Sequence, residues 1–187
     1  MRAPIAALFV TVAVLSATGL ARAQESTVAI DVAHSRARFA ITHLYLQRVT
    51  GSVPIAAGTV VFAAGSPVPA RVSATLDPRH IDTGNGDRDE DLQGPDWFDT
   101  RKFPAWTFAS TAIAPGSGGT FVIEGTLTIH GVAQPVTLTV TPGTASGHAT
   151  YHAAGKVDRH GFGMPLTAID GLLGGNVDLT LDVSLAK

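Results

Sequence analysis

The sequence predicts an all-β, antiparallel fold, and three observations support this. Apolar and polar residues alternate with a period of two, turn residues recur at short intervals, and only one short segment favours a helix. Strands with one apolar and one polar face form an antiparallel sheet with one solvated side. Such a sheet packs as a sandwich or closes into a barrel, and periodicity alone leaves both open.

The first 23 residues are expected to be a secretory signal peptide outside the fold. Arg2 gives a positive start, an apolar run broken only by Thr11 follows over residues 5–15, and residues 21–23 read Ala-Arg-Ala, an A-x-A cleavage pattern. The run is too short to span a membrane, which needs about 20 apolar residues. We therefore expect a single mature domain of residues 24–187 in the periplasm.

The composition of the mature chain argues against several classes of function. Without Arg2 and Arg22, eleven basic residues face fifteen acidic ones, a formal charge of −4, and no basic cluster occurs. This argues against nucleic acid and anionic membrane surfaces as partners. The absence of cysteine excludes disulfides, thiol catalysis and thiolate metal sites.

Five segments alternate strictly, and we predict a strand at each of them. In residues 36–43, His43 falls on the apolar face with Phe39 and Ile41. In residues 177–185, Asp178 and Asp182 share a polar face that must meet water. Turn residues separate the strands. The predicted strands are residues 36–43, 71–76, 121–130, 136–140 and 177–185, and the predicted turns are 64–67, 115–119, 131–135 and 141–143.

The segment 83–110 breaks the alternation. It combines charged residues, turn residues and five aromatic residues, and a short helix is expected at about residues 87–92. A long irregular connection in a β-protein is typical of a lid or a pocket wall.

Five motifs follow one another along the chain. They are Asp31-x-x-His34-Ser35 with Phe39, Ile41 and His43; Thr83 with Arg88-Asp89-x-x-Leu92; Asp96-Trp97-Phe98-Asp99 with Phe103-Pro104, Phe108 and Ser110; Gly125-x-Leu127-Thr128-Ile129-x-Gly131-Val132 with Pro135-Val136; and Arg159-x-x-Phe162-Gly163-Met164. In this order they resemble the YceI-like family of bacterial lipid-binding and polyisoprenoid-binding proteins, over essentially the whole mature chain.

The resemblance implies an eight-stranded, antiparallel, lipocalin-like barrel with a short helical lid segment and a long apolar tunnel. In that family the tunnel holds an amphiphile such as a polyprenyl chain, an isoprenoid quinone precursor or a fatty amide.

The candidate ligand-binding residues are mostly aromatic, because a lipid tail needs apolar wall, and aromatic rings offer large apolar faces at little entropy cost. Each could instead fill the core, although Trp97 and Phe98 fall outside the strand pattern and so favour the lining. The candidates are Phe39, Ile41, His43, Trp97, Phe98, Phe103, Trp106, Phe108, Phe162 and Met164.

Two polar residues have competing interpretations. His43 would donate a hydrogen bond to a ligand head group, or it would be a core histidine bonded within the protein. Arg88 could clamp an anionic head group, but the many carboxylates around it favour a structural pair with Asp89, Asp91 or Asp99.

No catalytic, metal or cofactor motif stands out. Asp87, Asp89 and Asp91 are spaced as in a calcium loop, but an EF-hand needs glycine at its sixth position and glutamate at its twelfth, where this chain has Leu92 and Phe98. There is no G-x-S-x-G motif and no glycine-rich phosphate loop. We therefore assign no catalytic residue, no metal and no cofactor, and predict that the protein is not an enzyme.

The sequence thus predicts an exported binding protein that carries or sequesters an amphiphilic, polyisoprenoid or isoprenoid quinone-like lipid in an apolar tunnel, as a monomer or a homodimer. Two alternatives stay open. One is an enzyme acting on such a lipid, which would need a reactive pair such as His43 and a carboxylate. The other is a ligand-free interaction module with a filled core, for instance a stress-related partner of a membrane redox protein.

Overall fold

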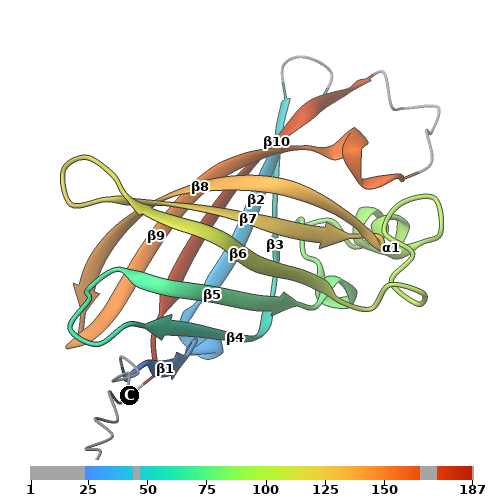
Figure 1. Ribbon diagram of the computed structural model, residues 1–187. Coiled ribbons are helices and arrows are strands. Elements are labelled where there is room, and N and C mark those ends of the chain that lie inside the picture. The colour runs from blue at the N-terminus through green and yellow to red at the C-terminus, as the bar shows by residue number, and fades with distance from the viewer. Residues whose placement is uncertain (1–23, 44–46, 165–171, 187) are drawn as a thin grey trace, which may run out of the picture.

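The strands of this protein form one antiparallel sheet (Figure 1). The computed structural model describes residues 24–43, 47–164 and 172–186, so the expected signal peptide lies outside the described residues. The sheet order is β1-β4-β5-β6-β7-β8-β9-β10-β2-β3. The strands are β1 (Ser26–Ala29), β2 (Arg36–His43), β3 (Gln47–Val53), β4 (Ile55–Phe62), β5 (Pro69–Leu76), β6 (Trp106–Pro115), β7 (Phe121–Ile129), β8 (Val132–Ala145), β9 (His148–Asp158) and β10 (Leu173–Ser184).

The sheet has ten strands, and the expected number of eight is wrong. Two features account for the difference. Pro54 divides one extended segment into β3 and β4, because a proline lacks the N–H that a ladder needs. At this point the chain passes from β3, at one edge of the sheet, to β4, which is next to the other edge. The four-residue β1 adds a further strand, paired with β4.

The sheet curls into a half-barrel around an apolar interior (Figure 1). Its two edge strands are β1 and β3, and no ladder joins them within the described residues. Two isolated bridges instead join residues at or beside these edge strands to other parts of the chain. Ser52 of β3 exchanges backbone hydrogen bonds of 2.8 and 3.0 Å with Asp82, and Ile30 bridges Leu185.

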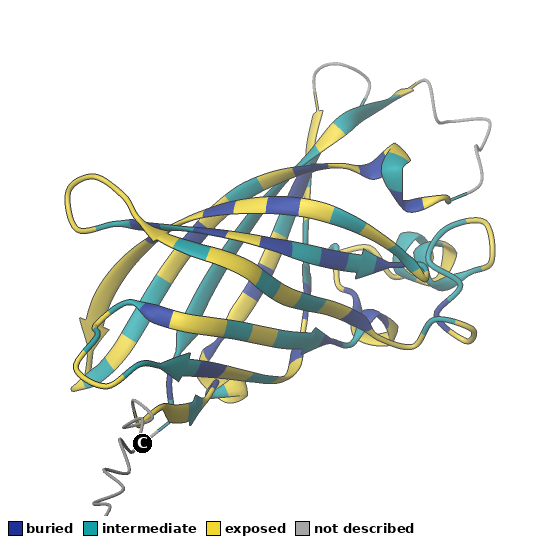
Figure 2. Ribbon diagram, viewed as in Figure 1, coloured by how far each residue is buried: buried dark blue, intermediate teal, exposed yellow. Residues whose placement is uncertain are grey.

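Burial alternates along the central strands, as the period of two predicts (Figure 2). In β7 the residues Phe121, Ile123, Leu127 and Ile129 are buried, and their neighbours point outward to varying degrees. β8 continues the pattern with three buried residues of its own. The buried faces of all these strands meet in one hydrophobic cluster, which is the interior of the half-barrel.

Two of the predicted turns are shorter or absent. The turn between β7 and β8 is confined to His130 and Gly131, both with positive φ, as a two-residue hairpin requires. β8 then runs through Pro135 and Pro142, so the turn predicted at 141–143 is wrong. In the register, Pro135 pairs only with β7 and Pro142 only with β9, so each proline lies where β8 has a neighbouring strand on one side alone.

The connection from β5 to β6 covers one end of the half-barrel (Figure 1). It contains the 3₁₀ turn η2 (Pro78–His80) and the helix α1 (Gly86–Gln93), which includes the predicted 87–92. Asn85 caps α1 by accepting a hydrogen bond from the Arg88 N–H, and acidic residues in the first turn suit the positive end of the helix dipole. None of the described helices is both long and apolar enough to cross a membrane.

Ion pairs lie on the outer face of β9, β10, β2 and β3. Each of two β10 carboxylates contacts two basic side chains. The neighbouring Lys156, with Arg48, lowers the pKa of Asp178. All of these partners are more than half exposed, so each pair adds little stability. The pairs are Asp182 with Arg38 and His152, and Asp178 with Arg48 (2.9 Å) and Lys156 (3.1 Å).

Candidate functional site

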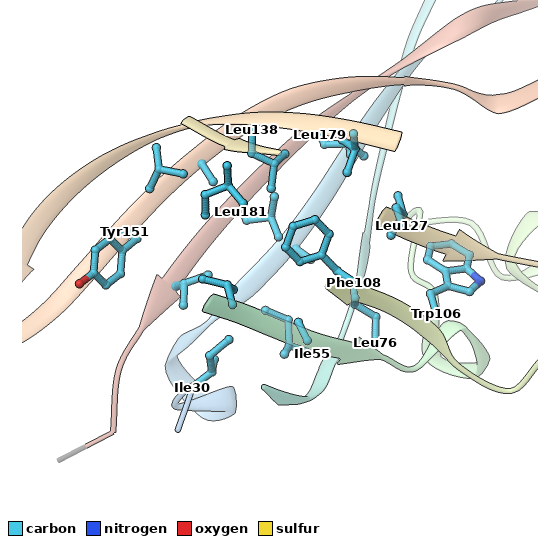
Figure 3. A pocket seen from close by; sticks show the side chains of 18 of the residues that line it. Ile30, Ile55, Leu76, Trp106, Phe108, Leu127, Leu138, Tyr151, Leu179 and Leu181 are labelled. Atoms are coloured by element: carbon cyan, nitrogen blue, oxygen red, sulfur yellow. The ribbon is translucent and has the colours of Figure 1, made fainter. Parts of the chain in front are cut away.

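The interior holds an inner cavity of about 140 Å³, bounded by side chains of the strands (Figure 3). Ile30, Ile55, Leu138 and Leu181 are typical of its wall, which is almost wholly aliphatic or aromatic. The side chain of Arg38, also on this wall, pairs with Asp182 outside the sheet, so its charge does not enter the cavity. The inner cavity therefore suits an uncharged, apolar group.

Among the described residues, Tyr151 brings the one hydroxyl group to that wall. It lies at the end of the inner cavity far from Trp106 (Figure 3) and packs edge-on against Phe121, with ring centroids 6.0 Å apart. Burial raises the pKa of the Tyr151 phenol above its ordinary value. The hydroxyl is consequently neutral at any physiological pH and offers a hydrogen bond, not a charge.

An outer cavity of about 240 Å³ lies under the β5–β6 connection. The connection supplies six of its lining residues, and the rest come from β2, β3, β6, β7, β9, β10 and the segment around the 3₁₀ turn η3 (Arg159–Phe162). Unlike the inner cavity, it has polar and charged members. They are His43, Thr83, Arg88, Asp91 and Arg159.

Four side chains line both cavities and so form a waist between them. Phe39 and Leu179 are register partners on β2 and β10, and Trp106 and Ile129 come from β6 and β7. The sheet order places these two strand pairs four positions apart, on facing walls of the curled sheet. The interior is thus divided into an apolar chamber and a chamber with polar groups, rather than forming one uniform tunnel.

Nine of the ten candidate residues line one or both cavities. Phe103 lines neither, because it packs against the hairpin of β7 and β8: its ring lies 4.5 Å from the His130 ring and over Gly131. The waist holds Phe39 and Trp106; the inner cavity Phe108; and the outer cavity Ile41, His43, Trp97, Phe98, Phe162 and Met164.

His43 faces the outer cavity beside Ile41, as its strand parity predicts. Its imidazole is half-buried and has no hydrogen-bond partner among the described residues. Asp91 lines the same cavity, but no hydrogen bond joins it to His43, so the described residues do not form a histidine–carboxylate pair there. The imidazole is open to a partner from solution.

Arg88 is held by a different residue from those expected. Its Nε donates to Thr83 Oγ1 at 2.8 Å and its Nη2 to the Thr83 carbonyl at 2.9 Å. The Thr83 N–H and hydroxyl in turn donate to Asp89, at 2.9 and 2.5 Å. The carboxylate thus orders the lid through Thr83, not by pairing with Arg88 directly.

Arg159 is a lining residue that the sequence analysis did not select. It is buried, and its Nε donates to the Gly174 carbonyl at 3.0 Å, which ties η3 to β10. Asp158 caps η3, and the hydrogen bond from the His160 backbone lowers the pKa of that carboxyl. The signal was present, because Arg159 opens the last of the five sequence motifs.

The described residues contain no group of three or more His, Asp or Glu side chains placed to hold a metal ion. The acidic stretch of α1 is used differently: Asp89 accepts from Thr83, and Asp91 lines the outer cavity. The chemistry available at the site is therefore apolar contact, hydrogen bonding and the charges at the outer cavity.

Solved structures of bacterial proteins share this fold. BcnA of Burkholderia cenocepacia superposes with a TM-score of 0.75 at 24% identity, covering 84% of this chain and 99% of the other. A domain of Saccharophagus degradans described as polyisoprenoid binding and implicated in plant cell wall breakdown superposes with a TM-score of 0.62 at 11% identity, covering 87% and 98%. These likenesses concern the fold alone.

Sequence relatives point the same way. The chain is 32% identical to protein YceI of Salmonella newport, over 70% of this chain and 68% of that protein. It is 31% identical to a UPF0312 protein of Shewanella oneidensis, and there the match spans 61% of the relative's length. The YceI-like domain model matches residues 29–185, which include every strand except part of β1 and both cavities. The chain therefore belongs to the YceI-like family.

Proposed function

We propose that this protein binds an amphiphilic lipid with an isoprenoid-type tail, and carries or sequesters it. The tail lies in the inner cavity and across the waist, and the head group lies in the outer cavity. The observation that carries the proposal is the division of the interior into an apolar chamber and a chamber with polar groups.

The two volumes set the size of the buried part. An apolar protein cavity of about 150 Å³ takes a benzene molecule. The inner cavity, at about 140 Å³, is therefore suited to one five-carbon isoprene unit, and the outer, at about 240 Å³, to one or two more or to a head group. Since burial contributes about 0.8 kcal/mol per CH₂ group, two or three units outweigh an association cost of at least about 4 kcal/mol.

The outer cavity suits a polar head group. Arg88 and Arg159 bring positive charge and Asp91 negative charge, and His43 has no partner within the described residues. A head group that accepts a hydrogen bond would satisfy the His43 imidazole. The Saccharophagus degradans domain with the same fold is described as binding polyisoprenoids, which supports this class of ligand.

We also propose that the protein acts in the periplasm, after removal of residues 1–23. The support is the positive start, the short apolar run and the A-x-A pattern of the sequence. The proposal requires neither a homodimer nor a membrane redox partner, because both cavities are already lined by described residues within a single chain.

Native mass spectrometry of freshly purified protein tests the proposal. We expect a bound species, and organic extraction should release a lipid with an isoprenoid tail. If the protein carries no lipid, and added isoprenoids of ten to fifteen carbons fail to bind with saturation, the interior is only a loosely packed core. Recovery of a chemically altered lipid after incubation would instead indicate an enzyme.

A further inference from the structure

Among the described residues, Trp106 carries the one fully buried side-chain nitrogen or oxygen without a hydrogen-bond partner. The residue is 7% exposed, and its indole Nε1 has no hydrogen-bond partner. Buried donors in native proteins are nearly always paired, because an unpaired one forfeits its bonds to water. An orphaned donor in a cavity wall points to an acceptor on a ligand.

The indole stands at the waist. Trp106 is the first residue of β6, pairs with Leu76 in the sheet and lines both cavities. Figure 3 shows its nitrogen on the side of the ring away from the inner-cavity side chains such as Phe108 and Tyr151. The N–H is therefore directed away from the apolar chamber.

The Phe98 ring packs against the indole. The two rings meet edge to face, with centroids 4.6 Å apart, which is a favourable aromatic arrangement but provides no oxygen or nitrogen acceptor. Phe98 belongs to the β5–β6 connection and lines only the outer cavity. Because Nε1 is fully buried, a ligand oxygen can reach it only if a neighbouring side chain moves, and Phe98 is the aromatic neighbour on the outer-cavity side.

The surroundings select the kind of acceptor. An indole N–H is an uncharged donor only. The inner cavity adjoining it presents no charge, because its one described cationic lining residue, Arg38, pairs with Asp182 outside the sheet. The cationic residues of the outer cavity, Arg88 and Arg159, already donate to Thr83 and Gly174. An anionic oxygen at the waist would lose its hydration without gaining a cation, whereas a carbonyl oxygen loses little.

We propose that Trp106 determines ligand specificity: its Nε1–H donates a hydrogen bond to an uncharged carbonyl oxygen, as in an isoprenoid ketone or quinone, held at the waist. The aliphatic tail then lies in the inner cavity and the carbonyl-bearing part in the outer cavity. This inference rests on the proposed function and adds to it the chemistry of the bound group.

The chain has only two tryptophans, Trp97 and Trp106, so an ¹H–¹⁵N spectrum of lipid-free protein should show two indole signals. Trp97→Phe leaves one signal and assigns it. The probes are geranylacetone, a ketone with an isoprenoid tail; the hydrocarbon that has CH₂ in place of its carbonyl; and farnesyl phosphate. We expect the ketone to move the Trp106 indole proton downfield and the hydrocarbon to leave it without that downfield shift.

Affinities provide the second measurement. The wild-type protein should prefer the ketone over the hydrocarbon about tenfold, equivalent to about 1.4 kcal/mol. Trp106→Phe keeps an aromatic ring but removes the N–H, so that preference should disappear. If the variant does not fold, the wild-type spectra with the two neutral probes still decide.

Three results would overturn the inference. Equal binding of ketone and hydrocarbon without the downfield shift would remove the role of Trp106 and leave lipid binding intact. Preference for farnesyl phosphate over the ketone, again without that shift, would place a charged head group at the site instead. Absence of saturable binding by all three probes would contradict the proposed function itself.

Discussion

Phe39 on β2 lies directly opposite Gly51 on β3, and its ring occupies the space in which a side chain at position 51 would begin. The glycine thus lets an aromatic ring lie close against the wall at the waist. A similar arrangement recurs where the Phe108 ring lies over Gly125 in the inner cavity. The absence of a side chain at these positions therefore helps to set the width of the interior.

Gly51→Ala should narrow the waist. The added methyl group would overlap the Phe39 ring, and the ring is the part that can move, so it should turn into the cavity. We expect lipid affinity to fall by about tenfold, about 1.4 kcal/mol, and measure it by competition in native mass spectrometry. The new methyl would also lie 3.0 Å from the Asp82 carbonyl oxygen, so a modest loss of thermal stability should accompany the change.

Gly86→Ala is the matched control. Gly86 begins α1, and nothing lies within 4 Å of the position that its Cβ would take. Both affinity and melting temperature should stay close to those of the wild type. Unchanged affinity in Gly51→Ala would show that the waist does not limit access.

Trp97→Ala should weaken lipid binding more than it lowers stability. Trp97 is half-buried and lines the outer cavity, so part of its area faces the ligand. Phe103→Ala is the control from the same connection, because Phe103 packs against His130 and lines neither cavity. Thermal melts and binding curves of both variants should separate the two effects. If Trp97→Ala lowers only the melting temperature, Trp97 is plain core.

His43→Phe should leave the fold intact and alter the choice of head group. The imidazole faces the outer cavity without a partner among the described residues, and one lost hydrogen bond is worth about 1 kcal/mol. We expect the preference for polar-headed lipids over hydrocarbons of equal length to fall about fivefold. Thr42→Val, on the exposed face of the same strand, should leave it unchanged. A lower melting temperature with the same preference would assign His43 a structural role.

Stability should depend on Asp77 at acidic pH. Hydrogen bonds from Arg79, the largest cause, lower the pKa of Asp77 from 3.8 to about 2. A carboxyl whose pKa is depressed by folding stabilises the folded state above its unfolded pKa. That contribution, roughly 1–2 kcal/mol, disappears as the pH falls from about 4 to about 2.

Asp77→Asn should therefore melt at a lower temperature than the wild type at pH 6, and the difference should shrink toward pH 2. Asp96→Asn removes the same charge from an exposed position of the same connection and should have little effect at either pH. A difference between Asp77→Asn and the wild type that persists at pH 2 would contradict the assignment.

Export should remove residues 1–23. N-terminal sequencing of protein recovered from the periplasmic fraction is expected to begin at Gln24, after the Ala-Arg-Ala pattern. Replacing Ala21 and Ala23 by larger residues should leave the precursor uncut. Recovery of an intact Met1 from that fraction would refute the cleavage.

The alternating strands and the helix could be predicted because their signals are local. In β7 and β8, side-chain parity follows directly from the period of two, and the acidic first turn with Asn85 before it marks α1. The neighbours of β2 could not be predicted this way, because the pairing of Phe39 with Leu179 depends on residues 140 positions apart. The strand count failed for a similar reason, since one proline decides whether residues 47–62 form one strand or two.

Membership of the cavity wall was predictable where strand parity decided it, as for Phe39, Ile41 and His43. In the irregular connection no parity rule applies: the break in the pattern favoured a lining role for Phe98, which does line the outer cavity, but it gave no way to tell that Phe103 packs against His130 instead. Sequence periodicity also gave no sign of the waist, because the waist arises from residues on facing walls. The many carboxylates near Arg88 in the sequence predicted a carboxylate partner, whereas its partner in the structure is Thr83.

The sheet order also determines when folding can finish. β2 and β3 pair with each other, but beyond that pair their only other neighbour in the sheet order is β10, the last of the described strands, which pairs with β2. Until β10 has been synthesised and has paired with β9, β2 and β3 have no strand through which to join the rest of the sheet. Pairings across so long a stretch of chain are slow to form, typically taking milliseconds to seconds. A chain truncated before residue 173 would therefore leave β2 and β3 without a place in the sheet, although β1 would keep its partner β4.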